Sequence, residues 1–426
     1  MSVVTPTTVA PVPPGRPPAQ RSRSMRRAAG TMAIAVLGLI VLLSVVRQLS
    51  GATDLTAAGA ISAALALAVP IAMAGLGGLW SERAGVVNIG LEGMMILGTW
   101  GAGWAGYQWG PWAGLVAAVI FGAVGGLLHA IATVIFTVDH IVSGVAINIL
   151  ALGATQYLSK ALFEGTEGGS TKQSPPVHPD MGGFSVPGIR DPLASLEKHG
   201  WFFVSDLAGI LRGLLTNLSW ITIIAILLFP LSYWVLWRTA FGLRLRSCGE
   251  SPVAAESLGI NVYRTKIVAV VVSGALSGVG GAALALAASN FYQEGQTGGR
   301  GYIGLAAMIF GNWRTGMLAA GSALFGFSDA LQLRGGGSVH ALLLLVAIIV
   351  IAVALWQLYR RRVVQGLVAL VFGALVLGYY LLSDQVPGEL TSALPYVTTL
   401  LVLALASQRL RMPAADGLPY RRGQGS

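Results

Sequence analysis

The chain contains few charged residues and almost no cysteine. Only 10% of its 426 residues are charged and 54% are hydrophobic, whereas soluble domains carry roughly 25% charged residues. This composition excludes an ordinary soluble domain and indicates an integral membrane protein. The single cysteine, Cys248, excludes an intrachain disulfide, and the scattered histidines lack the paired spacing of a metal site.

The signals of nucleic-acid binding, ATP binding and catalysis are also missing. The formal net charge is +10, but the basic residues cluster at the ends of apolar runs and in the tails, as the positive-inside rule requires. No G-x-x-x-x-G-K-[ST] loop occurs, and no paired acids or metal ligands suggest a membrane-embedded enzyme. We therefore expect a chain that is not an enzyme and binds no nucleic acid, metal or cofactor itself.

Long apolar runs dominate the sequence. Many reach the roughly 20 residues that cross a hydrocarbon core as a helix, and they lack the alternating pattern of an outer-membrane barrel. The predicted fold is all-α: a polytopic membrane helical bundle of about ten transmembrane helices, with broken or re-entrant segments. The predicted elements are 28–46, 56–80, 86–107, 111–136, 141–162, 218–238, 265–289, 302–333, 339–358, 365–383 and 390–407.

The polar segments divide the chain. Residues 1–27, rich in Pro, Thr and Arg, are predicted to form a disordered cytoplasmic tail, and residues 28–408 the transmembrane domain. The hydrophilic insertion 163–217 is expected on the extracytoplasmic side. The basic loop 239–264 and the tail 409–426 are expected in the cytoplasm, which places both termini there.

The apolar run 302–333 poses a topological problem. Counted as one span, it would leave the triplet Arg360, Arg361 and Arg362 outside, against the positive-inside rule. Two shorter arms that meet at an inner turn near residues 312–316 return the triplet to the cytoplasm. The sequence therefore predicts a broken helix pair in this region.

The stretch SERAGVVNIGLEGMM, residues 81–95, sets ionisable and amide side chains between apolar runs. An ionisable group at membrane depth is a functional candidate because its burial is costly. Asn88 and Glu92 share one helical face by their spacing, and nearby glycines permit an unwound turn whose backbone groups need partners. Two interpretations stay open: a permeation pathway, and a structural hinge held by a hydrogen bond to Glu92.

Two other spans repeat this pattern. Asn148 lies in HIVSGVAINIL and Asp329 in GFSDALQL. Amides, carboxylates and nearby aromatic rings suit a polyhydroxylated or heterocyclic solute, although each alone is more often a polar contact between helices. The residues predicted to line the substrate path are Asn88, Glu92, Asn148 and Asp329.

The loop FGLRLRSCGESPVAAESLGINVYRTK, residues 241–266, differs in kind. Pro252 can start a helix and Gly259 can end it, which predicts a short helix between basic flanks. Such a helix can dock into a groove of a partner, or it can be a plain amphipathic connector.

These residues carry a family resemblance. AAESLGI at 254–260 resembles the coupling-helix signature of ATP-binding cassette (ABC) importer permeases, with Val253 in place of the usual opening glutamate. GLGGLWSERAGVVNIGLEGMM, HIVSGVAINILALGAT, GLRLRSCGESPVAAESLGIN and GYIGLAAMIFGNW follow in the family's order. Together they resemble the nucleoside and simple-sugar branch of the branched-chain amino acid and simple-sugar permease superfamily.

The resemblance implies a permease that forms half of the translocation path for nucleosides in a bacterial cytoplasmic membrane. The implied partners are a second permease, giving a heterodimer, two ATP-binding subunits or one tandem chain that bind ATP and Mg²⁺, and an extracytoplasmic substrate-binding protein or lipoprotein. The residues predicted to contact the ATPase are Glu250, Ala254, Ala255, Gly259 and Ile260. The alternatives are a ribose-like simple-sugar ABC permease and an ion-coupled transporter that uses Glu92 or Asp329.

Overall fold

The computed structural model describes residues 34, 36–391 and 410–423. The predicted tail 1–27 and most of the predicted span 390–407 lie outside these residues. Within them the regular structure is helical, apart from two short antiparallel strands, β1 (Gly183–Phe184) and β2 (Leu218–Ser219). The prediction of an all-α membrane bundle is confirmed, because seven of the described helices are long and apolar enough to cross a membrane.

The helices follow the predicted apolar runs. A first helix covers Val36–Ser50, and two helices, α4 and α11, continue into π-helical turns at Ile131–Ile135 and Ala283–Ala288. The main helices are α2 (Ala58–Arg83), α3 (Leu91–Trp109), α4 (Pro111–Ala130), α5 (His140–Phe163), α8 (Trp220–Arg238), α11 (Val262–Ala282), α12 (Arg300–Phe310), α13 (Thr315–Leu333), α14 (Gly336–Tyr359) and α15 (Val363–Leu382).

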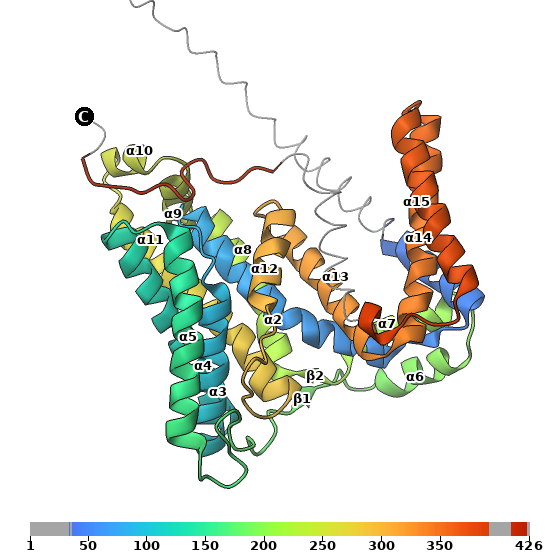
Figure 1. The fold of residues 1–426 in the computed structure, drawn as a ribbon, viewed down its shortest axis with the longest axis horizontal. Coiled ribbons are helices and arrows are strands. Elements are labelled where there is room, and N and C mark those ends of the chain that lie inside the picture. Colours follow the sequence, from blue (N-terminus) through green and yellow to red (C-terminus); the bar gives the residue numbers. More distant parts are fainter. Residues whose placement is uncertain (1–33, 35, 392–409, 424–426) are drawn as a thin grey trace, which may run out of the picture.

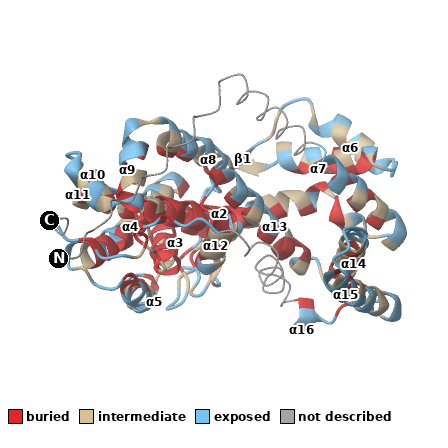
Figure 2. Ribbon diagram, turned by 90° about the horizontal axis from the view of Figure 1, so that it is seen from above, coloured by how far each residue is buried: buried red, intermediate tan, exposed pale blue. Residues whose placement is uncertain are grey.

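Glycine lets the central helices approach closely. A Cβ on Gly98 of α3 would lie 2.5 Å from Cα of Gly278 in α11, and one on Gly126 of α4 would lie 2.5 Å from the carbonyl oxygen of Val270, also in α11. Close backbone packing of this kind drives helix association in lipid, where apolar burial does not. Figure 2 shows the buried residues concentrated in α2, α3 and α4 at the centre of the molecule.

The run 302–333 forms two helices. α12 has 11 residues, about 16 Å of helix at 1.5 Å per residue, which is too short to cross a bilayer. A turn at residues 311–314 leads into α13, with Asn312 and Trp313 in the left-handed region at φ of 51° and 52°. The structure therefore has the broken pair that the arginine triplet predicts.

The polar segments lie at opposite ends of the bundle (Figure 1). At one end are α9 (Ala240–Glu250) and α10 (Pro252–Ser257), together with the last described residues. The insertion that follows α5 lies at the other end and contains α6 (Arg190–Lys198) and α7 (Val204–Leu215). α7 is anchored to the bundle because Asp206 forms an ion pair with Arg47 at 2.7 Å.

Candidate functional site

The chain is unwound between α2 and α3, at residues 84–90, which we call the helix break. Gly85 has a φ of +80°, a conformation that favours glycine. Because lipid offers no hydrogen bonds, each polar backbone group of the break needs a partner inside the protein. The end of α2 and Asn88 supply some of these partners, and side chains from three neighbouring helices supply others.

Two histidines and a lysine hold the first part of the break. Nε2 of His129, on α4, donates to the carbonyl oxygen of Val87 at 3.0 Å, and Nδ1 of His140, on α5, accepts from the backbone N–H of Val87 at 3.3 Å. Nζ of Lys266, on α11, donates to the carbonyl oxygen of Gly85 at 3.3 Å. Sequence analysis missed these three residues; their only signal was a polar side chain in an apolar run.

Asn148, on α5, holds the second part of the break. Its Oδ1 accepts the backbone N–H of Gly93 at 2.7 Å, and its Nδ2 donates to the carbonyl oxygen of Ile89 at 3.1 Å and to the hydroxyl of Tyr302 at 2.9 Å. Since Tyr302 is 46% exposed, this contact reaches the surface of the chain between α5 and α12.

Asn88 and Glu92 are buried in the break and at the start of α3. Asn88 donates to Oγ of Ser273 at 2.9 Å. The carboxylate of Glu92 accepts from the hydroxyl of Thr297 at 2.6 Å and from the backbone N–H groups of Gly299 and Gly301 at 2.9 and 2.7 Å. A carboxylate in this position satisfies free N–H groups at a helix start and interacts favourably with the helix dipole. This is the geometry of the hinge interpretation, and a solute-lining role for either residue stays a prediction.

Asp329, on α13, also reaches the start of α12. Its Oδ2 lies 3.2 Å from Nη2 of Arg300, and Arg300 donates further to the carbonyl oxygen of Thr297 at 3.3 Å. Three predicted path residues, Asp329, Glu92 and Asn148, therefore contact three consecutive residues of α12. The structure brings together helices that are far apart in the sequence at this one broken end.

The other end of α12 is tied to the end of α2. Nε1 of Trp313 donates to Oε2 of Glu82 at 2.6 Å, and Nη2 of Arg83 donates to the carbonyl oxygen of Trp313 at 2.7 Å. α12 is therefore fixed at both of its ends to the segments that flank the helix break.

The loop 239–264 contains the predicted short helix. In α10, Oγ of Ser251 caps the N–H of Ala254 at 3.4 Å, Pro252 occupies the first turn, and Gly259 follows the helix with a φ of +80°. Ala254 and Gly259 are exposed and Ile260 is half-buried.

The remaining predicted coupling residues, Ala255 and Glu250, make contacts within the chain. Ala255 is buried against Cys248 and Val262, so it fixes α10 and presents no surface. Glu250 is exposed, and Oε2 of Glu250 accepts the backbone N–H of Ala414 at 3.3 Å. Sequence analysis did not single out Leu258, which is 82% exposed, although it lies within the AAESLGI motif.

No metal site accompanies these features. Among the residues that the structure describes, no group of three or more His, Cys, Asp or Glu side chains could hold a metal ion.

The comparisons with known proteins agree with the family indicated by the motifs. The model of the family described as "Branched-chain amino acid transport system / permease component" matches residues 60–355. The chain belongs to this family. It is thus a multi-pass membrane permease.

Individual relatives cover most of the permease. This chain is 33% identical over 363 residues to the guanosine ABC transporter permease protein NupQ of Bacillus subtilis (strain 168). The aligned region covers 83% of this chain and 94% of NupQ. The chain is 32% identical over 359 residues to the nucleoside ABC transporter permease protein NupC of Lactococcus lactis subsp. cremoris (strain MG1363), with 82% and 93% covered. The putative glucose ABC transporter permease protein TsgC13 of Haloferax volcanii is 32% identical over 265 residues, with 62% of this chain and 74% of the relative covered. No solved structure matches the chain.

Proposed function

We propose that this permease is one of two different permease subunits of a bacterial ABC importer for nucleosides. The observation that carries the proposal is the match to the guanosine and nucleoside permeases along more than nine-tenths of their length. The match to the putative glucose permease TsgC13 has the same 32% identity as the match to NupC but covers less of both proteins, which makes a simple-sugar permease the second candidate.

The relatives support a heterodimer. Bacillus subtilis has a second guanosine permease protein, NupP, to which this chain is 24% identical, and Lactococcus lactis has a second nucleoside permease protein, NupB, at 23% identity. Two different permeases thus occur together in each organism. We expect the same arrangement here, with ATP and Mg²⁺ bound by separate ATP-binding subunits and the solute delivered by an extracytoplasmic binding protein.

The exposed surface of α10 is the proposed docking site for an ATP-binding subunit. Leu258, Ala254 and Gly259 present small and apolar groups there. This assignment places α9, α10 and both termini in the cytoplasm and the insertion 163–217 outside. The basic residues in and beside the loop 239–264 support this orientation: Arg238, Arg244, Arg246, Arg264 and Lys266.

The helix break is the proposed moving part. α11 begins shortly after α10, and its Lys266 and Ser273 contact the break directly. When the ATP-binding subunits close on ATP, they would displace α10. Because α11 contacts the helix break, it would transmit this movement to the break and to α12. The exposed ring of Tyr302 and the amide of Asn148 would then face the second permease across the solute path, where they offer a nucleobase a stacking surface and hydrogen bonds.

The test is uptake of radiolabelled guanosine by proteoliposomes that contain this permease and its co-purified subunits. We expect uptake that requires ATP on the side of the ATP-binding subunits, that a non-hydrolysable ATP analogue does not support, and that excess unlabelled nucleoside inhibits. Inhibition by ribose or glucose in place of nucleoside would favour the sugar permease. Uptake driven by an ion gradient without ATP would overturn the assignment.

A further inference from the structure

The last described residues, 410–423, form a segment of turns and irregular backbone that we call the C-terminal strap. It runs along the end of the bundle that carries α9 and α10 (Figure 1). The backbone N–H of Arg411 donates to Oδ1 of Asn312 at 2.7 Å, and the backbone N–H of Ala415 donates to the carbonyl oxygen of Gly249 at 2.8 Å. The strap is therefore attached to the α12–α13 turn and to the end of α9.

The middle of the strap is buried against the end of α2. Asp416 is only 7% exposed, and its carboxyl group is hydrogen-bonded to that of Glu82, the residue that also accepts from Trp313. The carbonyl oxygen of Ala415 lies 3.1 Å from the position that a Cβ on Gly85 would take. A side chain in the helix break at Gly85 would therefore press on the strap.

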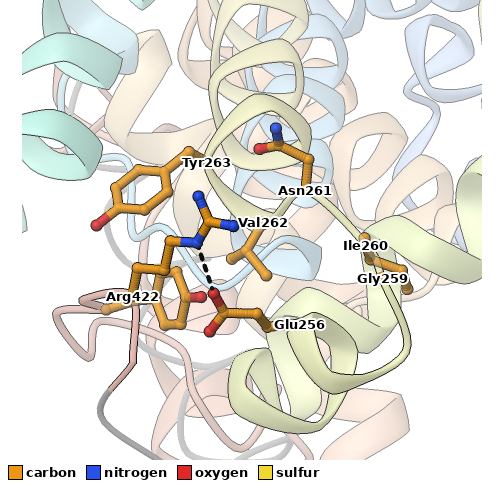
Figure 3. Close-up of a pocket in the computed structure, with 8 residues that line it drawn as sticks. Glu256, Gly259, Ile260, Asn261, Val262, Tyr263 and Arg422 are labelled. Atoms are coloured by element: carbon orange, nitrogen blue, oxygen red, sulfur yellow. Dashed lines mark hydrogen bonds and ion pairs between the residues drawn. The ribbon is translucent and has the colours of Figure 1, made fainter.

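The last residues of the strap contact α10. Tyr420 is buried in a cluster with Ala255 and Val262, and its hydroxyl is hydrogen-bonded to Glu256. Nε of Arg422 lies 3.2 Å from Oε1 of Glu256. Figure 3 shows Arg422 of the strap and Glu256 of α10 reaching toward each other. Both line a pocket of about 350 Å³ between the strap, α10 and the start of α11.

The strap helps to stabilise α10, because this helix depends on contacts with the rest of the chain. α10 has six residues, and helices this short are not stable without tertiary contacts. Its inward-facing residues, Ala255 and Glu256, contact the strap, while Leu258 stays exposed. Strap contacts therefore help to fix the direction in which α10 points.

We propose that the C-terminal strap is a coupling element that ties α10 to the end of α2 and to the α12–α13 turn, so that displacement of α10 is transmitted to the helix break through the strap as well as through α11. This inference rests on the proposed function, because it requires an ATP-binding partner that moves α10. The strap residues that position α10 are Tyr420 and Arg422, and Asp416 carries the connection to α2.

The test compares Tyr420→Ala with Tyr359→Ala, a matched change at a tyrosine that is 84% exposed at the end of α14. Reconstituted complexes are assayed for guanosine uptake, ATP hydrolysis and co-purification of the ATP-binding subunits. We expect Tyr420→Ala to keep its subunits and to lower uptake per ATP hydrolysed by about fivefold or more, the lower end of usual coupling effects. Tyr420→Phe, which keeps the ring, should restore most of the uptake per ATP.

A second measurement does not depend on the solute. Hydrogen–deuterium exchange is followed in α10 and in residues 84–90, with and without a non-hydrolysable ATP analogue. The wild-type complex should change its exchange in both segments, whereas Tyr420→Ala should keep the change in α10 and show a smaller change in residues 84–90, where only α11 still transmits the movement. Unaltered transmission to residues 84–90, or unaltered uptake per ATP, would overturn the strap as a coupling element. Failure of wild-type guanosine uptake would instead overturn the proposed nucleoside transport.

Discussion

The carboxylate of Glu92 accepts the backbone N–H of Gly301 at 2.7 Å, so the start of α3 is joined to the start of α12 inside the bundle. The residues on either side of Gly301 are held from other helices, Arg300 by Asp329 and Tyr302 by Asn148. Four helices thus meet at three consecutive residues, and a movement of one helix cannot leave the others in place.

Replacing Glu92 by Gln tests this junction. The amide keeps the shape of the side chain but removes the charge and turns one acceptor into a donor, so at least one of the three buried donors loses its partner. We expect the free energy of unfolding to fall by about 1–3 kcal/mol, with a matching loss of ATP-dependent uptake. Thermal unfolding of the purified permease and proteoliposome uptake measure the two effects.

Glu167→Gln is the matched control, because Glu167 is exposed in the insertion. It should leave both stability and uptake at the wild-type level. If the two variants behave alike, Glu92 does not hold the start of α12.

Replacing Gly93 by Ala tests the contact between α3 and α5. The new Cβ would lie 2.7 Å from the carbonyl oxygen of Ile147 and 2.8 Å from Cα of Asn148. Both are backbone atoms, so α5 itself must shift. We expect a loss of about 1–3 kcal/mol of stability, as for other overpacked sites. The measurement is thermal unfolding, with co-purification of the second permease as a check on assembly.

Gly153→Ala offers a control on α5, since no atom lies within 4 Å of the added Cβ. This change should be neutral or slightly stabilising, because alanine loses less backbone entropy in a helix than glycine. Equal destabilisation by both substitutions would show that steric contact at Gly93 is not the cause.

The sequence predicts the elements of this fold better than their connections. The apolar runs identify each long helix because crossing a bilayer demands continuous hydrophobicity, and the positive-inside rule predicts the broken pair through Arg360, Arg361 and Arg362. The partners of the helix break were not predictable. His129 and Lys266 meet residues 84–90 only after distant helices pack, and no spacing along the chain records that contact.

The contacts of the C-terminal tail could not be predicted from the sequence either. Residues 409–426 were predicted only as a cytoplasmic tail, because the segment is short and polar and shows no periodicity. Its buried residues, such as Asp416 and Tyr420, are buried only because α9, α10 and α11 form a surface that receives them.

Leu258→Ser tests the proposed docking surface on α10. Leu258 is largely exposed, so the change should leave the unfolding temperature of the isolated permease within experimental error. If the ATP-binding subunit covers this side chain, loss of the contact should weaken subunit association by about 1–3 kcal/mol, or roughly 5- to 150-fold. Titration of the labelled ATP-binding subunit onto the permease in nanodiscs measures the affinity.

Leu243→Ser, at an exposed leucine of α9, is the control for this prediction. It should bind the subunit with wild-type affinity. Wild-type affinity in Leu258→Ser would move the docking surface away from α10.

Gly259→Val should impair coupling for a different reason, since the left-handed backbone at Gly259 disfavours a β-branched residue.

The strap gives the permease a pH-dependent stability. Burial raises the pKa of Asp416 to about 7, against the lowering effects of the hydrogen bond to Glu82 and of the charges on Lys266 and Arg83. The folded state therefore binds more protons than the unfolded state between about pH 4 and 7, and the stability contributed by this group falls as the pH rises through that window. Asp416→Asn removes the titration and keeps a neutral side chain of the same shape.

Thermal unfolding of the wild type and of Asp416→Asn, between about pH 4 and 8.5, checks this sign. The two proteins should be nearly equal in stability at about pH 4, where Asp416 is protonated in the folded and the unfolded state. The wild type should become progressively less stable than Asp416→Asn as the pH rises to about 7, and the difference should then stay constant, because above this pH the wild type must either bury a carboxylate beside Glu82 or release the strap. Asp384→Asn, at an exposed aspartate, should follow the wild-type profile. Parallel curves for wild type and Asp416→Asn would mean that Asp416 does not hold a proton in the strap, and that the strap is bound through its backbone and Tyr420 alone.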